Sequence, residues 1–106
     1  MVRKREAYLE DILESIQRIK SYTDGMDYDD FVSNQKTVDA LINNLENIGE
    51  AAKNLEDGNE DFKWRDISDV RDVLVHQYFR ADKEIIWDIL KNELPQLEEK
   101  VNKDLN

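Results

Sequence analysis

The sequence predicts an all-α protein, a single domain folded as an antiparallel up-down bundle of four helices. Apolar residues recur every three or four positions in four stretches, which is the spacing of one helix face. No segment of useful length alternates with a period of two, as a half-buried strand would. The chain has 106 residues, of which 40% are hydrophobic, enough for one core but not two. We therefore expect one helical domain over residues 1–106, with short loops.

The first two predicted helices carry the clearest apolar stripes. Residues 5–22 place leucine and isoleucine on one face, and Gly25 is suited to the left-handed conformation that ends many helices. We expect Asp29 or Asp30 to cap the second helix, because a short side-chain oxygen can accept hydrogen bonds from the free N–H groups of a first turn. The second helix then keeps one apolar face for about five turns and ends near Leu55.

The third helix is expected to follow a short connector at residues 62–65. Asp66 or Ser68 can cap it, and its apolar residues run to about Phe79. This helix is important because the chemically active residues of the chain are concentrated on it.

The fourth helix is expected to start at Asp82 and to be interrupted near its middle. Pro95 lacks the N–H that a continuous helix needs, so we expect a kink or a break at residues 93–94, which would split the helix in two. Its apolar stripe consists of Ile85, Ile86, Ile89, Leu90, Leu94, Leu97 and Val101.

Composition excludes several classes of protein. The formal net charge is −10, which argues against a protein that coats DNA, since affinity for the phosphate backbone comes from clustered lysine and arginine. The chain has no cysteine and a single histidine, His76, which excludes disulfide scaffolds, Cys-based metal sites and multi-histidine metal sites.

No apolar run approaches the roughly 20 residues of a membrane span. Acidic residues interrupt the segment after the basic N-terminus, so no secretory signal is expected. We expect a soluble, cytoplasmic protein.

Charge is distributed unevenly along the chain. Residues 63–80 hold four basic and three acidic residues, whereas the rest of the chain is strongly acidic. The single histidine lies in this segment. This nearly neutral segment is therefore where we expect the functional site.

The third predicted helix combines residue types that can cleave RNA. Arg71 can bind a phosphate through two hydrogen bonds and keeps its charge, and His76 can accept or donate a proton near neutral pH. A base that removes the 2′-OH proton, and a cation that stabilises charge on the phosphoryl oxygens, suffice for cleavage without a metal or other cofactor. DNA lacks that hydroxyl, so this chemistry would select RNA.

An ideal helix does not by itself direct both groups at one phosphate. At about 100° per residue, His76 lies roughly 140° around the helix from Arg71, while Tyr78 lies within roughly 20° of it. Fraying near His76, a long arginine reaching around the helix, or two motifs meeting across a two-fold axis could each bring the groups together. Gly49 inside a helix and Trp87 off the apolar stripe favour the last arrangement, a homodimer.

The same residues also fit structural roles and different chemistry. Arg71 could pair with neighbouring aspartates on a solvated face, and His76 could be a structural histidine. Carboxylates on the second helix could bind Mg²⁺ or orient the motif side chains; the candidates are Asp39, Glu46 and Glu50. A triad of Ser68, His76 and Asp72 lacks the strand–turn–helix elbow that such a nucleophile needs. No phosphate-binding glycine loop is present, so ATP hydrolysis has no support.

Two segments resemble one known family over nearly the whole chain. Arg71-x4-His76-x-Tyr78 resembles the Arg-x4-His-x-Tyr motif of HEPN-domain proteins, specifically their HepT-like branch. Residues 39–53 resemble the second-helix signature of that branch, and residues 64–79 its third-helix signature. The motif alone is weak evidence, but both signatures in order on a helical chain of this length are strong evidence.

The resemblance implies an HEPN-like bundle and the toxin of a toxin–antitoxin system, acting as a metal-independent ribonuclease. Arg71 and His76 take the catalytic positions, with Asp72 and Glu50 as candidates for support. The implied partner is an antitoxin with a minimal nucleotidyltransferase fold, which transfers AMP from ATP onto Tyr78. An alternative is a noncatalytic helical subunit that binds such a transferase and a nucleotide. The expected assembly is a homodimer or a larger oligomer.

Overall fold

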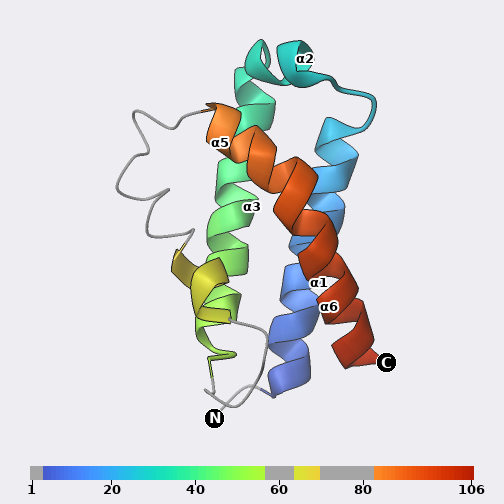
Figure 1. The fold of residues 1–106 in the computed structure, drawn as a ribbon, viewed down its shortest axis with the longest axis vertical. Helices are drawn as coiled ribbons and strands as arrows, with labels where there is room; N and C mark the ends of the chain where they lie inside the picture. The colour runs from blue at the N-terminus through green and yellow to red at the C-terminus, as the bar shows by residue number, and fades with distance from the viewer. Residues whose placement is uncertain (1–3, 57–63, 70–82) are drawn as a thin grey trace.

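The computed structural model describes residues 4–56, 64–69 and 83–106, and every regular element in these ranges is helical (Figure 1). The elements are α1 (Arg5–Thr23), α2 (Tyr28–Val32), α3 (Gln35–Lys53), α5 (Lys83–Asp88), the π-helical turn η2 (Ile89–Glu93) and α6 (Leu94–Leu105). Residues 64–69 form a further helical segment. The all-α prediction is therefore confirmed. The four-helix count stays a prediction, because most of the residues predicted to form the third helix lie outside the described residues.

Helix α1 packs against both α3 and α6 and provides the centre of the core. In Figure 1, α1 runs antiparallel to α3 and to the α5–α6 segment. The buried apolar side chains come from all three, as their periodicity predicts. They include Leu9, Ile12, Ile16 and Ile19 from α1, Val38, Leu41, Ile42, Leu45 and Ile48 from α3, and Leu94, Leu97 and Val101 from α6. This core holds α1 and α3 side by side and so creates the groove between them that is described below.

The turn after α1 is as predicted, but the start of the next helix is not. Gly25 has a φ of +75°, the left-handed conformation expected of it. The expected cap at Asp29 or Asp30 is wrong: Asp27 caps the separate short helix α2 in a capping box with Asp30, and Asn34 then caps α3 through the Thr37 N–H. The long second helix therefore starts at Gln35.

The third helical segment begins earlier than expected. Trp64 and Arg65, assigned from sequence to a connector, are already helical, so Asp66 and Ser68 do not cap a helix start. Trp64 is only 2% exposed and belongs to the hydrophobic core, and its burial explains why the helix includes it.

The interruption expected near Pro95 is confirmed. Pro95 lies in the first turn of α6, where its missing N–H costs nothing, and the π-helical turn η2 immediately precedes it. The Leu94 N–H donates to the Ile89 carbonyl oxygen, five residues back, which is the hydrogen-bond pattern of a π-helix. A π-helical turn is wider than an α-helical one. This widening accommodates the proline ring, which would crowd the carbonyl four residues earlier in an ordinary α-helix.

One member of the predicted apolar stripe is not buried. Ile85 is 48% exposed, whereas Ile86 is buried. The side chains at the centre of the stripe in this part of the chain are Ile86, Leu90 and Leu94. Ile85 lies about 100° around the helix from Ile86 and so falls outside the buried face.

Trp87 is accommodated within its own chain. Its ring centroid lies 5.2 Å from that of Phe31 and 6.0 Å from that of Tyr28, the latter in an edge-to-face arrangement, and Lys91 Nζ lies 4.6 Å from the centre of the indole ring. These contacts join α2 to the α5–η2 segment. Trp87 therefore gives no support to a dimer, while Gly49 is buried on α3 and leaves the question open.

Two ion pairs also join α1 to α6. Arg5 lies 3.8 Å from Asp104 near one end, and Lys20 lies 3.3 Å from Glu98 farther along. Pairs with this exposure contribute little, so apolar burial accounts for most of the contact. Within the described ranges, no helix is both long enough and apolar enough to cross a membrane.

Replacing Gly25 with alanine should lower the free energy of unfolding by about 1 kcal/mol, because a Cβ is disfavoured at this φ. The cost would come from the backbone alone, since a Cβ built there meets no atom within 4 Å. Gly25→Asn is the matched control and should lose less, because asparagine tolerates this conformation better. Urea unfolding followed by circular dichroism measures both, and equal stability of Gly25→Ala and the parent would contradict the expected backbone cost.

Candidate functional site

The structure describes only one member of the predicted site. Arg71, Asp72, His76 and Tyr78 lie outside the described residues, so their mutual geometry stays a prediction. Glu50 is described, and it lies near the C-terminal end of α3.

The segment that leads into the motif is fixed next to the end of α3. Trp64 anchors it in the core, as described above. The Ser68 hydroxyl donates to the Glu56 carboxylate at 2.6 Å and lies 2.9 Å from the Arg65 carbonyl oxygen. A hydroxyl held by a carboxylate in this way does not favour the alternative in which Ser68 is a nucleophile. The third helix therefore starts from a defined position beside α3.

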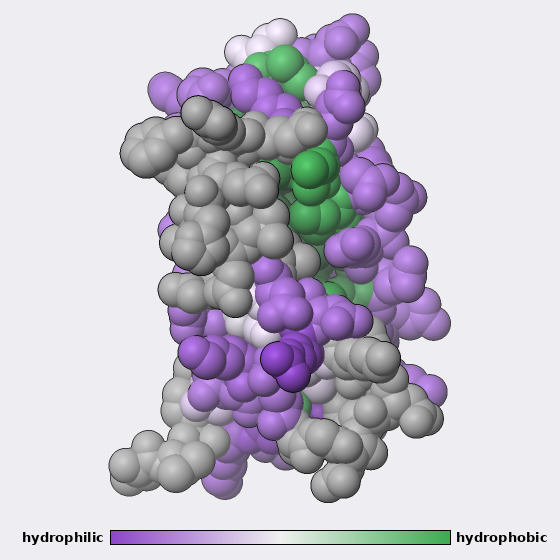
Figure 2. Space-filling view, turned by 60° about the vertical axis from the view of Figure 1, so that its left-hand side comes forward, coloured by the Kyte–Doolittle hydropathy of each residue, from purple (hydrophilic) through white to green (hydrophobic). Residues whose placement is uncertain are grey.

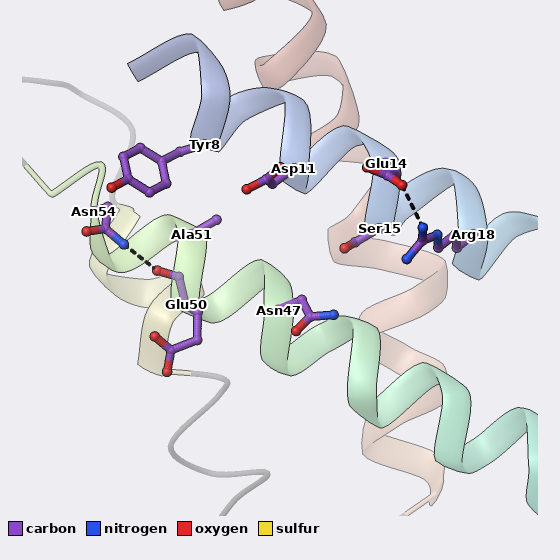
Figure 3. Close-up of a pocket in the computed structure, with 9 residues that line it drawn as sticks. All are labelled: Tyr8, Asp11, Glu14, Ser15, Arg18, Asn47, Glu50, Ala51 and Asn54. Carbon is purple, nitrogen blue, oxygen red and sulfur yellow. Dashed lines mark hydrogen bonds and ion pairs between the residues drawn. The ribbon is translucent and has the colours of Figure 1, made fainter. Parts of the chain in front are cut away.

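Glu50 forms part of the wall of a groove. Its backbone carbonyl oxygen accepts a hydrogen bond from Asn54 Nδ2 at 2.9 Å, and its exposed side chain points away from α1 (Figure 3). The carboxylate is thus at the edge of the groove and not inside it. Whether it approaches the motif stays a prediction.

The groove lies between α1 and α3 and has a volume of about 360 Å³ (Figure 3). It was not predicted from the sequence. The described residues that line it are mostly polar: Tyr8, Asp11, Glu14, Ser15, Arg18, Asn47, Glu50, Ala51 and Asn54. Arg18 pairs with Glu14 at 2.6 Å, one turn apart on α1. The sequence signal that could have revealed it is the polar edge of α1, where Asp11, Ser15 and Arg18 recur every three or four residues.

A second, much smaller hollow is apolar. It lies between α3, the 64–69 segment and the η2–α6 junction, and Figure 2 brings this side of the molecule forward, with apolar surface visible between polar residues. Its lining includes Leu45, Ile48, Ile67, Ile89, Leu94 and Leu97. Among the described residues that line it, Glu93 is the single charged one, so this part of the chain offers few groups there that could do chemistry.

The Mg²⁺ alternative gains no support from the second-helix carboxylates. Asp39 accepts a hydrogen bond from Gln35 Nε2 at 2.9 Å. In the part of the chain that the structure describes, which includes Asp39, Glu46 and Glu50, no three acidic or histidine side chains are grouped as a metal site requires.

Comparisons with known proteins agree with the resemblance in the sequence. The family model described as "Ribonuclease HepT-like" matches residues 12–103. A protein of Thermococcus cleftensis named "Probable ribonuclease HepT" is 39% identical over 110 aligned positions, which cover 97% of each chain. A protein of Methanocaldococcus jannaschii named "Putative RNase MJ0127" is 44% identical over 96 positions, covering 84% of this chain and 77% of that protein. No solved structure matches. The chain thus belongs to the ribonuclease HepT-like family.

Proposed function

We propose that this protein is the toxin of a toxin–antitoxin system, a cytoplasmic, metal-independent endoribonuclease that consists of a single domain. The observation that carries the proposal is the family match over residues 12–103, because this range contains Arg71, His76 and Tyr78. The relatives named as ribonucleases support RNA as the substrate. The acidic surface supports a narrow site, since a chain with a net charge of −10 repels RNA everywhere except near clustered basic residues.

The proposed reaction is an internal transesterification. His76 removes the proton from a ribose 2′-OH, and the 2′-oxygen attacks the adjacent phosphorus atom. The bond from phosphorus to the 5′-oxygen breaks, and that oxygen takes up a proton from an acid, which leaves a 2′,3′-cyclic phosphate and a 5′-OH end. Arg71 stabilises the charge that develops on the phosphoryl oxygens. Tyr78 positions the substrate, with Asp72 and Glu50 as supporting residues.

Two copies of the chain complete the proposed site. Arg71 and His76 lie on different sides of an ideal helix, so a two-fold axis between paired third helices would place the arginine of one copy beside the histidine of the other. The buried Gly49 on α3 is compatible with a close approach of helices. A homodimer is therefore the proposed minimal unit, and larger oligomers are compatible with it.

The proposed partner is an antitoxin with a minimal nucleotidyltransferase fold. It would transfer AMP to Tyr78: the phenolic oxygen attacks the α-phosphorus of ATP, pyrophosphate leaves, and the phenol loses its proton. Each AMP adds bulk and about one negative charge where an RNA phosphate must bind. The modification would occupy Arg71 and repel the substrate at the same time.

Replacing His76 with alanine should reduce RNA cleavage in EDTA by about 10²- to 10⁴-fold, the usual contribution of a general acid–base residue. Arg71→Ala should lose about 10²- to 10³-fold, because it removes charge stabilisation. Gel analysis of a labelled RNA measures both rates. Lys103→Ala removes an exposed cation on α6, outside residues 71–78 of the sequence, and serves as the control. Unchanged cleavage by His76→Ala would contradict the catalytic assignment and would favour a noncatalytic subunit.

Mixing Arg71→Ala with His76→Ala should restore about a quarter of the parent activity if the site is shared between two copies. Random exchange makes half of the dimers mixed, and each mixed dimer then holds one intact Arg–His pair instead of two. Cleavage assays after refolding the mixture measure this. The same mixture stays inactive if both groups act within one chain.

Incubation with the transferase encoded beside it and ATP should add the mass of one or more AMP groups to the intact protein. Tyr78→Phe should abolish this addition, because the acceptor oxygen is gone. Intact-protein mass spectrometry measures both, and Tyr8→Phe, which removes a phenol on α1, is the control. Persistence of the added mass on Tyr78→Phe would assign the acceptor to another residue.

A further inference from the structure

The segment that precedes the motif in the sequence is held on its polar side by a carboxylate. We propose that Glu56 and Ser68 are positioning residues for RNA cleavage, because the hydrogen bond between them fixes the rotation of the 64–69 segment and so the direction in which the chain leads to Arg71. The proposal rests on the proposed function, since Arg71 is the group that the pair would position. Neither Glu56 nor Ser68 takes part in the reaction itself.

The contact between Ser68 and Glu56 joins two parts of the chain that are 12 residues apart. The Ser68 hydroxyl donates to Glu56 Oε1 at 2.6 Å, the short distance that is typical of a hydroxyl bound to an ionised carboxylate. A hydroxyl has one proton, so the Arg65 carbonyl oxygen, which lies 2.9 Å away, does not receive it at the same time. The carboxylate therefore takes a hydrogen bond that a helical serine would otherwise make within its own turn.

Glu56 directly follows the fixed end of α3. Leu55 is only 1% exposed, and its N–H donates to the Ala52 carbonyl oxygen at 2.9 Å. The Asn54 side chain donates to the Glu50 carbonyl oxygen at the same distance. These contacts fix the backbone next to Glu56, so its carboxylate can hold another segment in place.

Three side chains of the 64–69 segment contact the rest of the molecule from one side. Trp64 is buried, Ile67 packs partly buried against the core, and Ser68 meets Glu56. Positions three and four apart share one face of a helix, which agrees with this arrangement. Apolar contacts hold the segment against the core but are non-directional, whereas a hydrogen bond depends on its angles. The Ser68–Glu56 bond is therefore the contact that defines the rotation of the segment about its axis.

This rotation is important because Arg71 follows shortly after Ser68 in the sequence. If the helix continues to about Phe79, as the sequence predicts, Arg71 is seven residues beyond Trp64 and within about 20° of it around the axis. A rotation of the 64–69 segment would then turn the guanidinium by a similar angle. Charge stabilisation depends on such alignment, and a displacement of about 1 Å can cost about 10²-fold in rate.

The kcat and KM of RNA cleavage in EDTA test the proposal. Ser68→Ala should lower kcat about tenfold and leave KM within twofold, because the hydrogen bond acts through Arg71 and does not contact RNA. Ser68→Thr keeps the hydroxyl and should stay within threefold of the parent. Ser21→Ala is the matched control, since it removes a hydroxyl at an exposed position of α1, and it should leave kcat unchanged.

Double variants separate positioning from a general loss of folded protein. Glu56→Ala should match Ser68→Ala, and the two together should lose no more than either alone, because both remove the same bond. Ser68→Ala should also cost nothing further in the Arg71→Ala protein, whereas a loss of folded protein would lower the rate equally in both backgrounds. An unchanged kcat in Ser68→Ala, additive losses, an effect confined to KM, or an equal loss in the Arg71→Ala protein overturns the proposal.

Nuclear magnetic resonance relaxation examines the same contact without cleavage. In Ser68→Ala the backbone order parameters of residues 64–69 should fall from about 0.85, typical of a rigid backbone, toward about 0.6, while those of α1 stay unchanged. Unchanged order parameters in this segment overturn the proposal. A parent protein that cuts no RNA contradicts the proposed function instead, and the relaxation result then still decides whether the pair fixes the segment.

Discussion

The burial of the apolar stripe of α1 between α3 and α6 is the contact on which the rest of the structure depends. An isolated helix of this length is only marginally stable in water, so tertiary packing has to provide most of its stability. Ile12 and Ile19 are completely buried in that contact. It fixes the distance between α1 and α3, which determines the groove, and it holds the end of α3 where the 64–69 segment starts. The position of the 64–69 segment, which precedes the motif in the sequence, therefore depends on a hydrophobic contact between other helices.

The parts of the fold that were predictable are those in which the sequence pattern directly reflects burial or backbone restriction. The periodicity of α1 and α3 predicted their buried faces because one helix face meets the core. Gly25 and Pro95 were predictable because each residue type restricts the backbone in one specific way. The cap at Asp27 was missed because three aspartates compete within four positions, and only the pairing of Asp27 with Asp30 distinguishes them.

The features that sequence could not predict arise where segments distant in the sequence meet. Trp64 gave no helical signal, because it is a single apolar residue among charged ones, and its burial depends on the surfaces it contacts. The groove depends on the polar edge of α1 facing that of α3, which no local pattern specifies. Of the site residues, Glu50 is at the groove edge, while Arg71, Asp72, His76 and Tyr78 stay predictions. The family match supports their roles through the sequence alone.

The π-helical turn η2 has a consequence for how this chain can change in length. The wider turn holds one residue more than an ordinary α-helical turn, so it absorbs that residue without much rotation of the helix on either side, and Trp87 keeps its orientation toward Phe31. Deleting one residue there would restore ordinary α-helical winding and leave the indole facing its aromatic neighbours. A homologue that is one residue shorter in this segment could therefore keep the same aromatic contact between α2 and the C-terminal helices.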